Sequence, residues 1–246
     1  MNAFARALIV CACLALAACA TSGQTKTYPP LAGSNSQIDL QGLSWWGVRF
    51  KMHWPADEPP DLSGHLLLAE QVLQPVILEH EADLQLWRFH RRARRDGAGN
   101  QFSLIFLADD QTAKRIDADL RLGALTQRLE NAGMLDRVRF EQLSPEAATR
   151  LDDTSDPSWP ESMQRSWPWF IMGASQAWLI QLQSISQEQG LSASMDYAAL
   201  TDHYAAVAAR MNEQWRSNAR HAYFHHLSAI YGYQPVQLRS GELKRF

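Results

Sequence analysis

Cysteine is scarce in this chain and lies only near its N-terminus. The 246 residues contain three cysteines, at positions 11, 13 and 19. Residues 20–246 therefore hold no thiol, which excludes an internal disulfide, a thiolate nucleophile and a cysteine-ligated zinc ion in that part of the chain. Its stability has to come from an apolar core.

Long hydrophobic runs are missing as well. The N-terminal apolar run, residues 7–16, has about half of the ~20 residues that a transmembrane helix needs. It follows Arg6 and precedes the small residues Ala17 and Ala18, which is typical of a cleaved secretory signal peptide. We therefore expect export from the cytoplasm.

Leu16, Ala17, Ala18 and Cys19 resemble the lipobox of bacterial lipoproteins. The resemblance implies that the Cys19 thiol is diacylglycerylated, that the signal peptide is cut before it, and that the new amino terminus is acylated. Two or more acyl chains give stable membrane attachment. Position 20 is alanine instead of the aspartate that retains such proteins in the inner membrane. The resemblance thus implies an outer-membrane location, with the body facing the periplasm.

Composition changes along the chain and predicts five segments. Residues 1–18 are the expected signal peptide, and residues 19–42, rich in Ser, Thr, Gly and Pro, form a lipidated flexible tether. Residues 43–143 alternate between strand and helix patterns. Residues 144–157 are expected to be a linker, and residues 158–246 a helical region.

The order of these patterns predicts an α+β fold with a ferredoxin-like β-α-β-β-α-β sheet domain. Strands are expected over residues 46–54, 84–92 and 101–108 and around 138–141. Ser63 and Asp110 are placed to cap the two intervening helices. Two longer helices follow, over about 161–189 and 196–231, and we expect Pro75 and Pro168 to kink or interrupt their helices.

Separating the strand residues by face predicts a basic surface. If the aromatic side chains of each strand point to the helices, the opposite face carries cationic and imidazole side chains: Arg49, Lys51, His53, Arg88, His90, Arg92 and Arg139. Arginine pairs well with phosphate and carboxylate groups, so this face is suited to an anion, a lipid headgroup or an acidic protein. The alternatives are that the C-terminal helices cover the face or that its charges are simply solvated.

A strong excess of one charge is absent, with 23 basic and 26 acidic residues. This balance argues against a general polyanion binder, and export removes the chain from the usual nucleic-acid compartments. We therefore expect no nucleic-acid partner.

Complete catalytic motifs are absent too. The stretch around Ser175 lacks the second glycine of a nucleophile elbow, and His80 lacks the second histidine of an H-E-x-x-H motif. His221 and His225 lie one helical turn apart, followed by His226, and could share a metal ion. Two imidazoles are an incomplete ligand set, and a buried pair of His225 with Asn218 in a helix interface is the alternative.

These observations predict a non-enzymatic envelope protein without a cofactor. It is attached to the membrane through the lipid on Cys19 and binds an envelope protein or an anionic envelope component. The alternative is a periplasmic enzyme, a hydrolase or a metal-dependent enzyme, that uses the helix histidines or His90 with nearby carboxylates.

Overall fold

The computed structural model describes residues 38–144, 148–192, 195–237, 241 and 243–244. The expected signal peptide, the lipid attachment at Cys19 and most of the tether lie outside these residues.

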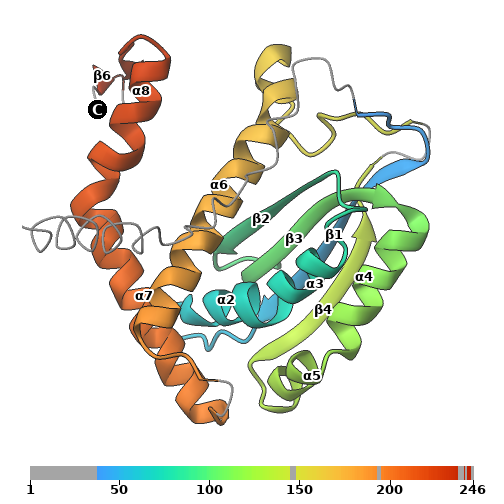
Figure 1. Cartoon of the computed structure of the whole chain (residues 1–246), viewed down its shortest axis with the longest axis vertical. Helices are drawn as coiled ribbons and strands as arrows, with labels where there is room; N and C mark the ends of the chain where they lie inside the picture. Colours follow the sequence, from blue (N-terminus) through green and yellow to red (C-terminus); the bar gives the residue numbers. More distant parts are fainter. Residues whose placement is uncertain (1–37, 145–147, 193–194, 238–240, 242, 245–246) are drawn as a thin grey trace, which may run out of the picture. The chain divides into compact units, whose positions relative to one another are not determined.

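A four-stranded antiparallel sheet forms the centre of the fold. Its strands are β1 (Leu43–Met52), β2 (Leu86–Ala93), β3 (Asn100–Asp109) and β4 (Leu135–Gln142), in the order β2-β3-β1-β4. Helices connect β1 to β2 and β3 to β4, and a hairpin joins β2 to β3 (Figure 1). This is the ferredoxin-like arrangement, which confirms the predicted α+β fold class.

The core fixes the register of the central strands. Apolar side chains of β1 lie opposite apolar side chains of β3, in the pairs Trp46 with Phe106, Val48 with Leu104 and Phe50 with Phe102. All six are buried in the core that the sheet shares with the helices. A shift by one residue would turn each of them to the opposite face, so this register is strongly favoured.

Within the connection from β1 to β2 the chain is continuously helical from Ser63 to Glu79, as α2 (Ser63–Leu67), the π-helical turn η1 (Leu68–Leu73) and α3 (Gln74–Glu79). Pro75 has no backbone N–H for an α-helical bond, and the π-helical turn directly before it lets the chain remain helical. The expected cap at Ser63 is wrong. The Asp61 carboxylate accepts the Ser63 backbone N–H at 2.8 Å, and Ser63 is already the first helical residue.

The connection from β3 to β4 contains α4 (Asp110–Leu122) and α5 (Ala124–Asn131), which are separated at Gly123. The cap of α4 is Asp109, not Asp110 as the sequence suggests. Its carboxylate accepts the Thr112 backbone N–H at 2.9 Å. Asp109 is also the last residue of β3, so the strand passes into the helix without a loop.

The C-terminal region contains α6 (Glu161–Glu188) and α7 (Tyr197–Ala219). Pro168 lies inside α6, where it is buried and does not interrupt the helix as expected. After α7 the chain continues through the π-helical turn η2 (Arg220–His225) and α8 (His226–Ile230), and β5 (Val236–Gln237) pairs with β6 (Leu243–Lys244). None of the helices in the described ranges combines the length and the hydropathy needed to cross a membrane.

Helix α6 covers the outer edge of the sheet at β2, while α7 packs against α2 and α6 (Figure 1). At this edge the Phe89 backbone N–H donates to Ser175 Oγ at 3.1 Å, and Ser175 Oγ donates to the Ile171 carbonyl oxygen at 2.8 Å. Ser175 therefore satisfies an edge group that no neighbouring strand can reach. An edge covered in this way cannot pair with another strand.

Candidate anion-binding site

The sheet face turned away from α2 to α5 is divided into an apolar half and a basic half. On the apolar half, Trp45 is buried beneath residues 148–157, which we name the cover segment. Trp45 Nε1 donates to the Arg150 carbonyl oxygen at 3.0 Å, and an Arg88 guanidinium N–H donates to the Thr154 carbonyl oxygen at 3.2 Å. The part of the chain expected to be a linker is thus docked on the sheet.

The basic half places cations of neighbouring strands directly opposite one another. Arg49 on β1 pairs in register with Arg139 on β4, and Lys51 pairs with Arg137. Like charges in such positions repel each other. The side chains surround a cavity of about 230 Å³, which we name the basic pocket; it is lined by Arg49, Lys51, Gln101, Arg137 and Arg139 and by Gly97 and Ala98 of the β2–β3 turn.

One carboxylate neutralises only part of this charge. Glu141 forms ion pairs with Arg49 and with Arg139, the latter at 2.8 Å. Lys51 and Arg137 have no ion-pair partner among the described residues. The basic pocket therefore keeps excess positive charge on the side nearest the β2–β3 turn.

The predicted basic residues of β2 share this face but lie outside the pocket. Arg92 pairs with Asp96 of the turn. Burial, with a smaller effect of the Arg49 charge, lowers the pKa of Arg88 to about 10, so Arg88 stays protonated at neutral pH. Partial burial also lowers the pKa of His90, and repulsion by Arg88, Arg49 and Arg92 lowers it further. His90 is therefore neutral at pH 7.

His53 lies apart from the predicted set. It follows the end of β1, is exposed, and its Nδ1 lies 3.0 Å from Asp136 Oδ1. Two pocket residues were missed instead. Arg137 lies two residues before Arg139 and therefore on the same face of the strand. Extending the last predicted strand towards its N-terminus would have identified it. Gln101 faces Lys51 because of the β1–β3 register, and apolar alternation in the sequence does not distinguish this register from one shifted by two residues.

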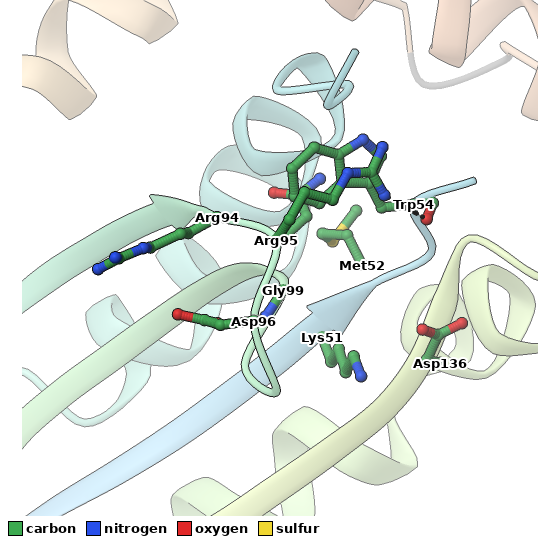
Figure 2. Close-up of a pocket in the computed structure, with 9 residues that line it drawn as sticks. Lys51, Met52, Trp54, Arg94, Arg95, Asp96, Gly99 and Asp136 are labelled. Atoms are coloured by element: carbon green, nitrogen blue, oxygen red, sulfur yellow. Dashed lines mark hydrogen bonds between the residues drawn. The ribbon is translucent and has the colours of Figure 1, made fainter. Parts of the chain in front are cut away.

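A second hollow, of about 330 Å³, lies beyond the end of β1 and shares Lys51 with the basic pocket (Figure 2). In this hollow the Arg95 guanidinium lies over the Trp54 ring, 3.5 Å from its centroid, and donates to the Pro55 and Glu58 carbonyl oxygens, both at 2.7 Å. Arg95 thus holds the loop that follows β1. Asp96 and Asp136 also line the hollow, so its charge is mixed and it suits an anion less well.

The three histidines that the sequence analysis considered as metal ligands lie beyond the C-terminal end of α7. His221 and His225 belong to η2, and His226 begins α8. The expected buried pair of His225 with Asn218 does not form. Asn218 is exposed and donates to the Gln214 carbonyl oxygen of its own helix at 3.3 Å.

Two further histidine clusters are explained by packing. His80 Nε2 lies 2.8 Å from Asp119 Oδ2 and connects α3 to α4; with Glu79 these residues place three possible metal ligands within 4.8 Å of one another. Ser186 Oγ lies 2.9 Å from His203 Nε2, which resembles half of a hydrolase triad. Ser186 is 0% exposed and His203 7% exposed, so a substrate cannot reach this pair.

Comparisons with known proteins add little beyond the fold. No protein-family model matches the chain, and no curated protein is significantly similar to it. Similar solved structures include PA3566 from Pseudomonas aeruginosa, at 18% identity and a TM-score of 0.26, covering 42% of this chain and 95% of that one. A dimeric ferredoxin-like protein of unknown function from Thermobifida fusca is 17% identical with a TM-score of 0.24, covering 43% and 94%. Neither similarity bears on function.

Proposed function

We propose that this chain is an outer-membrane lipoprotein that binds a phosphate-bearing component of the cell envelope in its basic pocket. The observation that carries the proposal is the position of Lys51 opposite Arg137, both lining one pocket and neither ion-paired within the described part of the chain. Two cations held together in this way repel each other, and a bound anion would remove that repulsion.

The kinds of side chain in the pocket favour phosphate over other anions. Three guanidinium groups and one ammonium group meet there. A guanidinium donates two parallel hydrogen bonds to neighbouring oxygens, whereas the lysine ammonium acts as a point charge. A phosphate group has enough oxygens to accept from several of these donors at once.

The N-terminus supports a location next to such ligands. The lipobox resemblance implies that a lipid on Cys19 attaches the chain to a membrane, and a flexible linker as long as the expected tether would span roughly 25 Å. The basic pocket would then stay within reach of phospholipid headgroups in the same leaflet. A soluble phosphorylated component of the periplasm offers the same chemistry, and the experiment below separates the two sources.

The test measures binding of the non-lipidated chain, with Cys19 replaced by Ser, to vesicles of phosphatidylglycerol and of phosphatidylcholine. A basic residue near an anionic surface contributes about 1 kcal/mol, so Lys51→Glu with Arg137→Glu should weaken binding to the anionic vesicles by about 30-fold or more. The matched control is Arg128→Glu with Arg216→Glu, which changes the net charge equally at exposed helix positions outside the pocket.

The outcomes are distinct. Loss of vesicle binding in the pocket variant, but not in the control, supports a lipid headgroup. Binding of inorganic phosphate that the pocket variant loses, without vesicle binding, indicates a soluble phosphate compound. Equal binding by the parent chain and the pocket variant would show that the basic pocket is not the site.

A further inference from the structure

A π-helical turn brings three histidines together at the end of the long C-terminal helix. In an α-helix, with 3.6 residues per turn, side chains five positions apart point about 140° away from each other. In a π-helical turn the hydrogen bonds run from residue i to i+5, so such residues share one face. Because η2 spans Arg220–His225, His221 has both His225 and His226 as neighbours.

The spacing of the three imidazole rings matches what a single metal ion requires. The ring centroids are 5.4 Å apart for His221 and His225, 5.2 Å for His221 and His226, and 5.4 Å for His225 and His226. A zinc ion about 2.0–2.1 Å from one nitrogen of each ring, at tetrahedral angles, holds the centroids about 5.2 Å apart. The planes of the His221 and His225 rings are nearly parallel, at 13°. Metal binding would therefore require the side chains to reorient until one nitrogen of each ring points to a common centre.

The residues after the helix add a second unusual feature at the same place. Tyr233 has a φ of 57°, a left-handed conformation that a non-glycine residue adopts at a cost of about 1–3 kcal/mol. This conformation places its ring 5.5 Å from that of His225. Strain of this kind is concentrated at functional sites.

We propose that His221, His225 and His226 form a binding site for a divalent transition-metal ion of the zinc class, with Tyr233 as its wall. Three imidazoles suit zinc, nickel and copper and leave a position open for water or another ligand. His221 and His226 are exposed and His225 is half-buried, so an ion can reach them. This site is independent of the basic pocket.

Zinc titration of the full-length protein by calorimetry tests the proposal. We expect one zinc ion per chain, and His221→Ala and His226→Ala should each weaken binding by more than about tenfold. His226→Ala is the decisive variant, because an α-helical site built from His221 and His225 alone would not need it. The control is His53→Ala, which removes an exposed histidine elsewhere. Circular dichroism of each variant confirms that the helices remain.

A second measurement locates the ion directly. Zinc should shift the imidazole NMR signals of His221, His225 and His226 and leave that of His53 unchanged. Zinc binding of equal affinity in the parent and in both cluster variants would overturn the proposal and would point to Glu79, His80 and Asp119 instead. Absence of zinc binding would overturn it as well.

Discussion

Acidification should destabilise the folded protein through His65, a histidine that folding removes from water. Its ring is 0% exposed and stacks on Phe102 at a centroid distance of 5.2 Å. The Arg91 Nε–H donates to His65 Nδ1 at 3.2 Å, so the proton of the neutral ring lies on Nε2. Burial, and then the charge of Arg91, lowers the pKa of His65 to about 3, against a weaker opposing effect of Asn100.

The sign and size of the effect follow from the two protonation states. In the unfolded chain the pKa of His65 is about 6.5, so below that pH the unfolded state binds a proton that the folded state does not bind. The free energy of unfolding therefore falls as the pH falls from 6.5 towards 3. Between pH 7.5 and pH 5.0 the loss from this one group is about 2 kcal/mol.

Urea unfolding, followed by tryptophan fluorescence at several pH values, measures this loss. His65→Phe keeps an aromatic ring against Phe102 but cannot titrate. We expect the variant to be less stable at pH 7.5, since Arg91 loses its acceptor. The difference in unfolding free energy between the two proteins should then shrink by about 2 kcal/mol at pH 5.0.

Other titrating groups, including His90, are common to both proteins and cancel in this difference. Stability profiles that run parallel from pH 7.5 to pH 5.0 would refute the reasoning, because they would show that His65 gains its proton equally in both states. A difference that grows on acidification would refute it more strongly, since it would mean that folding raises the pKa of His65.

Two further predictions concern the sheet edge and the membrane anchor. Ser175→Ala leaves the Phe89 backbone N–H without its acceptor, which should cost about 1–3 kcal/mol and speed hydrogen exchange at that amide; an unchanged exchange rate would contradict the role given to Ser175. Cys19→Ser should move the protein from the membrane fraction to the soluble fraction of cells, and continued membrane association would show that lipid is not the sole attachment.

The sequence predicts the strands and their faces well because burial imposes a simple pattern on a half-covered sheet. From Trp46 to Met52 every second residue of β1 is apolar and faces the helices, and the same alternation identifies the basic face. Arg91 follows His90 in β2 and lies on the opposite face from Arg88 and Arg92, a position that the sequence analysis did not assign. In the structure Arg91 points to the helix side, where its guanidinium lies over Trp178 at 5.1 Å from the ring centroid.

Local competition between neighbouring residues is less predictable. Asp109 and Asp110 are both good helix caps, and the choice of Asp109 follows from where β3 ends. The same holds for the break between α4 and α5 at Gly123 and for the two π-helical turns. These features depend on packing against the sheet, which the hydrophobic periodicity of the sequence does not reveal. These differences concern a cap, a break between two helices and two helical turns, and they leave the fold unchanged.

The site was predicted only in part, because charge in a sequence does not show which cations are already paired. Arg49, Lys51 and Arg139 line the basic pocket as part of the predicted face. Whether each is neutralised depends on Glu141, which reaches the two arginines but not the lysine. To tell the paired cations from the unpaired ones, the alignment of β3, β1 and β4 has to be known. No local sequence pattern contains this information.

The cover segment explains why one sheet face serves two purposes. A short stretch of chain cannot cover the whole face, and it docks where the strands present Trp45 and Leu86, whose burial offsets part of the cost of ordering it. The remaining half, nearest the β2–β3 turn, carries the cations and stays accessible. An uncharged polar residue in place of either Lys51 or Arg137 would remove the repulsion between them. The proposed anionic ligand would relieve the repulsion within this facing pair at the uncovered end of the sheet.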